Sequence, residues 1–217
     1  KNPEPIITFH NEDSMATNVQ ICNLALSHIG SRAFIQDLTS DNSVEARYCN
    51  LLFDDARQAV LRDAPHGWGF AYKVEALALK VAADVTIPAS WTYAYAWPAD
   101  CLRALHIVTA DNIADPVPFA PGTDIALEAK VIFSNEADAV LGYTADIIAS
   151  HMFDAGFVHA LSWNLAADLA PPLTGDRAIQ DVSFRLYRQA LDAALRADAS
   201  EGEPTPERDS EFIRVRN

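Results

Sequence analysis

The sequence predicts an α+β fold in which a helical bundle, built from both chain ends, carries a small antiparallel β insertion and extended terminal arms. Apolar residues recur at helical spacing near both ends of the 217-residue chain and alternate at strand spacing in the middle. The two termini combine prolines with few apolar residues, which favours extended structure. We therefore expect an N-terminal arm at 1–16, a helical bundle from 17–72 and 146–200, a β-rich insertion at 73–145 and a C-terminal docking tail at 201–217.

Two amphipathic helices are expected in the first third of the chain. The first runs from about Asn18 to Ile29 and ends at Gly30, a residue suited to a left-handed helix cap. The second follows a linker rich in Asp, Asn and Ser, which are common N-cap residues. It should stop near Ala64, because the residue before a proline, here Pro65, is disfavoured in a helix.

The middle of the chain is marked by a row of aromatic residues that alternate with smaller ones. This spacing predicts a strand through Trp91, Tyr93, Tyr95 and Trp97. Because four rings in water would form a large apolar patch, we expect the row to be buried in the β unit or packed against another subunit. A platform for stacked nucleic-acid bases is less favoured, since no Lys or Arg cluster accompanies the rings. Further strands are expected at 74–79, 102–109, 125–133 and 139–144.

Helical spacing returns after the insertion. One helix carries Phe153, Phe157, Leu161 and Leu165 and should end at Pro171 and Pro172. A last helix begins near Asp176 and is expected to turn four apolar residues inward, namely Ile179, Val182, Leu186 and Ala193.

The charge of the chain limits its partners. Thirty acidic residues against 16 basic ones give a net charge of -14, which repels DNA at long range. A sequence-specific DNA reader is therefore disfavoured, whereas a wall past which DNA slides is compatible, and so is a surface that is acidic only for solubility. No stretch approaches the roughly 20 apolar residues of a membrane span, so we expect a soluble protein made in a cytoplasm.

The sequence lacks the common signatures of catalysis. It contains no glycine-rich phosphate loop, no His-Glu-x-x-His and no Gly-x-Ser-x-Gly, so no catalytic, cofactor-binding or metal-binding residue is expected. On a continuous helix, His151 and His159 would lie about 12 Å apart, too far to share one metal. The three cysteines, Cys22, Cys49 and Cys101, are expected to be buried free thiols.

Several segments resemble one protein family. They are ICNLALSHIG at 21–30, FDDAR at 53–57, WGFA at 68–71, YAWPADCLR at 95–103, and the late helical hairpin through FVHAL at 157–161 and LTG at 173–175. In order and spacing they are similar to the tail tubular protein A family, the head-to-tail adaptors of podoviruses. The likeness covers about Thr17 to Gly202 and leaves residues 1–16 outside.

The resemblance implies a structural protein and no cofactor. Members of such a family form a ring, commonly of twelve copies, between the portal protein and the tail nozzle protein in the neck of the virion. DNA passes through the lumen of the ring during packaging and ejection, without specific binding. We accordingly expect an adaptor subunit and not an enzyme.

The C-terminal tail is expected to dock on the portal or on neighbouring subunits. Residues 201–207 form a polar spacer with two prolines, followed by a short segment able to extend, with Phe212, Ile213, Arg214, Val215 and Arg216 as the docking residues. A lone strand of this size does not offset its ordering entropy, so a partner edge is needed. The alternative is an inert tail.

Two other functions remain open at this stage. The acidic composition is compatible with a tail-associated peptidoglycan hydrolase that uses a carboxylate pair. It is also compatible with an acidic regulatory protein that binds a host partner as a monomer.

Overall fold

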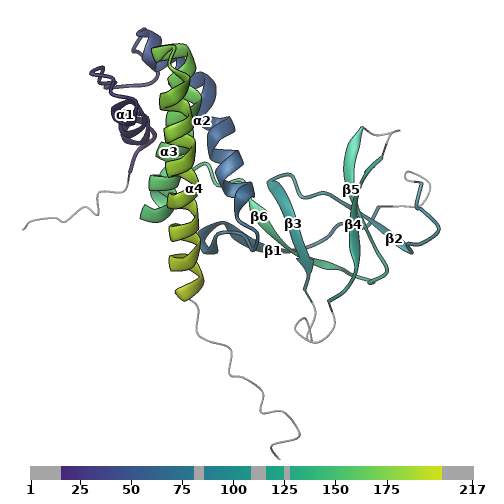
Figure 1. Cartoon of the computed structure of the whole chain (residues 1–217). Coiled ribbons are helices and arrows are strands. Elements are labelled where there is room, and N and C mark those ends of the chain that lie inside the picture. The colour runs from purple at the N-terminus through teal and green to yellow at the C-terminus, as the bar shows by residue number, and fades with distance from the viewer. Residues whose placement is uncertain (1–15, 81–85, 109–115, 125–127, 202–217) are drawn as a thin grey trace, which may run out of the picture.

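The computed structural model describes residues 16–80, 86–108, 116–124 and 128–201, which form a helical unit and a β unit side by side (Figure 1). The helices are α1 (Asn18–His28), α2 (Val44–Asp63), α3 (Ala155–Thr174) and α4 (Arg177–Ser200), with 3-10 turns η1 (Gly69–Ala71) and η2 (Ser150–Met152). The arm at 1–16 and the tail at 201–217 lie outside the described residues, apart from Ala16 and Glu201.

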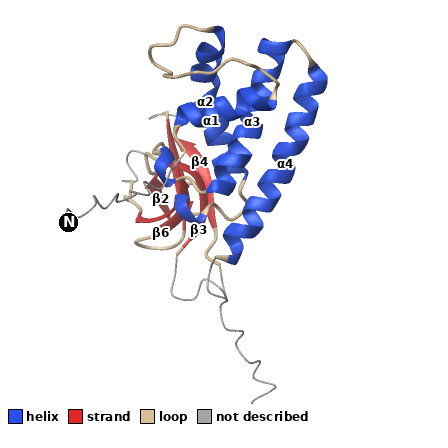
Figure 2. Cartoon of the chain, turned by 90° about the vertical axis from the view of Figure 1, so that its left-hand side faces the viewer, coloured by secondary structure: helices blue, strands red, loops and turns tan. Residues whose placement is uncertain are grey.

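Helix α3 is the centre of the helical unit. It packs against α1, α2 and α4, and Figure 2 shows it between α2 and α4. The ring of Phe157, on α3, meets the ring of Trp68 edge to face at 5.2 Å between centroids, and both side chains are buried. Trp68 also donates from its indole N–H to the carbonyl of Val60 in α2, so one residue ties two helices to the loop that leads into the β unit.

Local capping residues place the ends of the first two helices where the sequence predicts them. Thr17 and Gln20 form a capping box at the start of α1, and Ser43 caps α2. Helix α2 ends at Asp63, and Ala64 is already extended before Pro65.

Two predictions about the late helices are wrong. Helix α3 does not stop at Pro171 and Pro172 but continues to Thr174, because only two N–H groups are lost near its end and Gly175 closes it in the left-handed conformation. On α4, Val182 is 42% exposed while Tyr187 is buried. The hydroxyl of Tyr187 donates to the carboxylate of Asp63 at 2.5 Å, which turns a more polar stripe of α4 toward the core.

The prediction of a helical bundle with a small β insertion is also wrong. The described residues form an α+β fold, about 47% helix and 20% strand, with two three-stranded antiparallel sheets. One sheet has the order β1-β6-β3 and the other β2-β5-β4. The strands are β1 (Tyr72–Ala76), β2 (Tyr93–Ala96), β3 (Cys101–Ile107), β4 (Phe119–Asp124), β5 (Ala129–Ser134) and β6 (Val140–Ala145).

The sequence understates the β unit because β4 contains Pro121 and Gly122, which favour a loop. Pairing with β5 overrides that preference: β4 aligns with β5 over its full length, from Phe119 opposite Ser134 to Asp124 opposite Ala129. An edge strand such as β4 tolerates a proline, since one side of its backbone needs no partner.

The two sheets share one extended segment, residues 72–80. Its first half pairs with β6 as β1. Its second half pairs with β2: Ala96 donates its N–H to the carbonyl of Ala78, and Lys80 donates to the carbonyl of Ala94. The sheets enclose a core that includes Tyr95, Ile132, Leu141 and Tyr143.

The helical and β units are joined by buried polar contacts. The guanidinium of Arg57, 2% exposed on α2, forms an ion pair with Asp146 and donates to the carbonyl of Ile147 just after β6. Arg103 on β3 donates to the carbonyls of Arg62 and Ala64, which are left open at the end of α2. The β unit is therefore fixed to α2 by charged hydrogen bonds, which are stronger than neutral ones.

Candidate assembly surfaces

The predicted aromatic row is divided between the two faces of β2. Tyr95 is 1% exposed and donates its hydroxyl to the carbonyl of Glu136 at 2.6 Å. Tyr93 and Trp97 are half-buried against the same core cluster, and the indole of Trp97 donates to the carbonyl of Cys101. Trp91 instead packs with Ala94 and Phe133 on a separate cluster.

The positions of these four rings limit the functions that the aromatic row can have. Three of the rings close the core between the sheets, so they do not form a continuous platform for stacked bases. Contact with another subunit remains a prediction for the half-exposed parts of Trp91, Tyr93 and Trp97. The predicted docking residues, Phe212 to Arg216, lie outside the described residues.

Helix α2 carries an apolar stripe that its own chain leaves uncovered. Val44 is 48% exposed and Leu51 is 67% exposed, and half-buried Tyr48 lies between them at i+4 and i+7 spacing. Together with Arg47, they line a shallow hollow of about 270 Å³. We name Val44, Tyr48 and Leu51 the α2 stripe.

Helix α4 carries a second uncovered stripe. Ile179 and Leu186 are half-buried, Val182 is 42% exposed and Ala193 is exposed. Their spacing places all four on one side of the helix, next to the side that faces α3. These are the residues that the sequence predicts to face inward, and we name them the α4 stripe.

The two stripes lie on different helices, α2 and α4, which both pack against α3. Helix α3 separates α2 from α4, as the inter-helix contacts and Figure 2 both show. The balance of exposed charges differs as well: α2 exposes Asp54, Asp55 and Asp63 beside Arg47 and Arg62, while α4 exposes four arginines, Arg177, Arg185, Arg188 and Arg196, beside Asp181 and Asp192. The two surfaces are thus different in shape and complementary in charge, which suits contact between unlike surfaces of two copies.

Sequence reasoning missed the α2 stripe because apolar residues at helical spacing predict a helix without showing which of its faces other elements cover. The signal was present: α2 has apolar residues around more of its circumference than one core-facing stripe requires. A surplus of this kind in a helix indicates a second contact surface.

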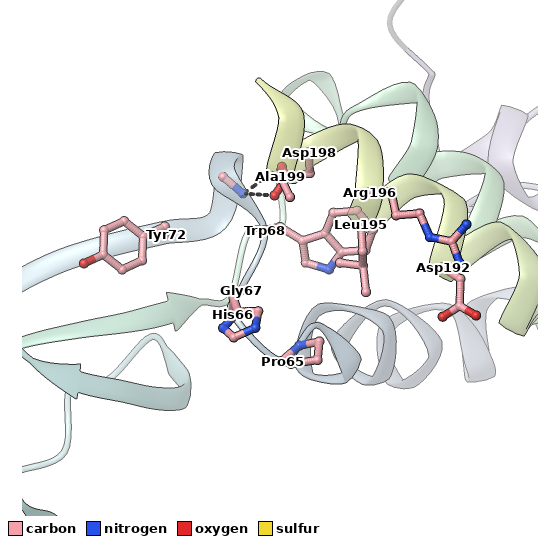
Figure 3. Close-up of a pocket in the computed structure, with 11 residues that line it drawn as sticks. Pro65, His66, Gly67, Trp68, Tyr72, Asp192, Leu195, Arg196, Asp198 and Ala199 are labelled. Carbon is pink, nitrogen blue, oxygen red and sulfur yellow. Dashed lines mark hydrogen bonds between the residues drawn. The ribbon is translucent and has the colours of Figure 1, made fainter. Parts of the chain in front are cut away.

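A larger cavity of about 590 Å³ lies between the loop after α2 and the end of α4 (Figure 3). Pro65, Trp68 and Leu195 form its apolar wall, and Arg196 lies at its side. Asp198 accepts the backbone N–H of Gly69 with both carboxylate oxygens, at 3.0 and 3.3 Å, so this acid has a structural partner.

An acidic cluster lies near the end of α4, beside this cavity. Burial and the charges of Glu201 and Asp198 raise the pKa of Asp154, but this cluster has no nucleophile–base pair beside it in the described residues. No group of three or more His, Cys, Asp or Glu in that part of the chain could hold a metal. The three cysteines are free and buried, and burial raises the pKa of Cys101 to about 12, which leaves its thiol unreactive.

One further polar cluster lies between α1 and α3. The rings of His28 and Trp163 stack with their centroids 3.6 Å apart, and Trp163 donates its indole N–H to His159. His28 also contacts the hydroxyl of the buried Ser162 at 3.1 Å. Burial and the nearby His159 lower the pKa of His28, so protonation of His28 opposes this packing.

Comparison with known proteins found no family model and no curated protein that matches the chain. Among the described residues, no helix is both long and apolar enough to cross a membrane.

Proposed function

We propose that this chain is a structural ring subunit, a head-to-tail adaptor that joins a phage portal protein to the tail nozzle protein. Its partners are the portal, the nozzle and copies of itself, with twelve as the expected ring number. The chain acts in the neck of the virion, and DNA passes through the ring without specific binding.

The observation that carries this proposal is the pair of apolar stripes on α2 and α4, which the described part of the chain leaves at least partly uncovered. A contact between the α2 stripe of one copy and the α4 stripe of the next is heterologous, and such contacts build a ring when the rotation between neighbouring copies closes. The basic excess among the exposed residues of α4 would face the small acidic excess on α2 in each contact, which favours one orientation and fast association.

The acidic charge fits a DNA conduit. A wall with more carboxylates than basic groups leaves phosphates without binding sites, so DNA slides without being held. The net charge of -14 motivates this part of the proposal.

The proposal is tested by assembly on purified portal, followed by mass measurement. We expect Leu51→Asp and Val182→Asp to abolish ring formation while the circular dichroism spectrum of the free protein is unchanged, because both positions are exposed. Leu79→Asp is the matched control, since Leu79 is 59% exposed but lies on the β unit. Rings at the wild-type yield with both stripe variants would refute the proposed contact.

A further inference from the structure

Strand β1 has one side whose backbone groups have no strand partner in the described part of the chain. Leu77 donates its N–H to the carbonyl of Ala139, next to β6, so the odd-numbered residues of this segment face β6. In an antiparallel ladder the alternate residues point the other way. The N–H and C=O groups of Tyr72, Val74 and Ala76 therefore point away from β6.

The open side of β1 is a slot of five residues. Two residues farther along, Ala78 and Lys80 use the same side of the backbone to bind β2, which closes one end of the slot. At the other end the chain turns into η1 and the helical unit. All five residues of β1 are exposed, including Val74 at 48% and Tyr72 at 41%.

We propose that residues 211–217 of the same chain add to this edge of β1 as a further strand. These residues lie outside the described part of the chain. The pairing does not depend on the adaptor role and is expected in the free protein.

The tail starts beside the slot. Helix α4 ends at Ser200, and Asp198 in its last turn binds the backbone of Gly69, three residues before β1 begins. The ten residues 201–210 reach about 33 Å when extended, and a five-residue strand is about 17 Å long. The spacer can therefore pass along the slot and let the following residues return antiparallel to β1.

The side-chain pattern of the segment matches the two faces of the edge. In an extended chain, Ile213 and Val215 share one face, and Arg214 and Arg216 share the other with Phe212. On β1, Tyr72 and Val74 occupy one face. The other face carries Lys73 and Glu75, and Lys73 is also paired with Asp100, so two carboxylates outweigh one amine there. Apolar side chains would meet apolar ones, and the arginines would lie over the surplus acid.

The slot suits a single strand better than a second copy of β1. Because β2 follows on the open side of residues 78–80, a second copy paired through its own β1 would bring its β2 toward the helical unit of the first. A short segment on a polar spacer has no such attachment. Tethering through ten residues also gives it a high effective concentration at the edge.

Amide hydrogen exchange, measured by NMR on the free protein, tests the pairing at single residues. In the full chain the outward amide of Val74 should exchange at least about tenfold more slowly than in a chain ending at Ser200. The amide of Glu75, which faces β6, is the internal control and should exchange at the same rate in both. Adding a synthetic peptide of residues 201–217 to the short chain should slow Val74 again.

A pair of substitutions in the tail completes the test. Ile213→Asp together with Val215→Asp should speed exchange at Val74, whereas Thr205→Asp in the spacer should not. Equal rates at Val74 in the full and shortened chains would overturn the proposal. Protection that disappears on dilution to monomer would also overturn it, since the strand would then come from a neighbouring copy. Because these exchange measurements contain no portal protein, either of these two results would leave the adaptor proposal untouched.

Discussion

The helical unit and the β unit are stabilised in different ways. The helical core is a continuous apolar cluster in which the rings of Trp68, Phe70, Phe153 and Phe157 contact one another. The β core is smaller, and its buried tyrosines carry hydroxyl groups that need partners: Tyr95 donates to a carbonyl, and Tyr143 donates to Glu75 and Asp100. The helical unit thus depends on filled volume, while the β unit depends on particular hydrogen bonds as well.

This difference implies that equal changes in side-chain size should have unequal effects in the two units. Loss of a large ring should destabilise the helical unit most, because interior packing leaves a cavity that cannot fully collapse. Loss of one polar atom should matter most in the β unit and at the junction, where the remaining partner is left without compensation.

The largest effect is expected for Phe157→Ala. This ring is fully buried among three aromatic neighbours, so its loss should lower the free energy of unfolding by about 3–5 kcal/mol. Chemical denaturation followed by circular dichroism measures the change. Phe184→Ala on α4 is the matched control. Because Phe184 is 51% exposed, its loss should lower the free energy of unfolding only slightly. Similar losses for both variants would contradict a packed helical core.

The next effect is expected at the junction, for Arg57→Met. This substitution leaves Asp146 without its buried partner. Because Asp146 is 21% exposed, we expect the free energy of unfolding to fall by about 2–3 kcal/mol, less than for a fully buried pair. The double variant with Asp146→Leu should recover part of this loss, which a double-mutant cycle measures. Additive losses would show that the two residues do not act as a pair.

A smaller effect is expected for Tyr143→Phe. The hydroxyl bonds to Glu75 and Asp100 at 3.0 and 2.9 Å, and its removal should cost about 1–2 kcal/mol while the ring stays packed. Tyr93→Phe provides the comparison, since Tyr93 is half-buried and its hydroxyl makes no hydrogen bond to the described residues. If Tyr143→Phe leaves the free energy of unfolding unchanged, ring packing alone stabilises the β core.

The smallest effect concerns pH. Because burial lowers the pKa of His28 below its usual value of 6.5, the unfolded chain takes up a proton before the folded one does. The contribution of His28 to stability is therefore complete above about pH 6.5 and is lost as the pH falls below it. His28→Gln should flatten thermal stability between about pH 5 and pH 7, whereas exposed His151→Gln should not. An unchanged profile for His28→Gln would exclude this histidine as a source of acid sensitivity.

The sequence predicts those features that depend on neighbouring residues. The ends of α1 and α2 follow from Thr17, Ser43 and Pro65, which act within one helical turn. Prediction from the sequence fails where contacts between residues far apart in the chain determine the structure. The inward side of α4 depends on the bond from Tyr187 to Asp63, and β4 forms through Pro121 and Gly122 because β5 supplies its partners.

The assembly surfaces show the same limit. Alternation in the aromatic row correctly indicates a strand at β2, but which ring faces which core depends on how the two sheets stack. The α2 stripe is visible in the sequence as apolar residues, yet only the placement of α3 shows that nothing in the described chain covers them.

The segment shared by the two sheets has a mechanical consequence. Strand β1 belongs to one sheet, and the backbone that continues it bonds to β2 of the other, so force applied to the outer sheet travels along covalent backbone to η1 and the helices. The hydrogen bonds of this segment to β6 or those to β2 would have to break before the sheets could separate. We therefore expect the two sheets to respond to a pull as one piece until one of these sets of bonds breaks.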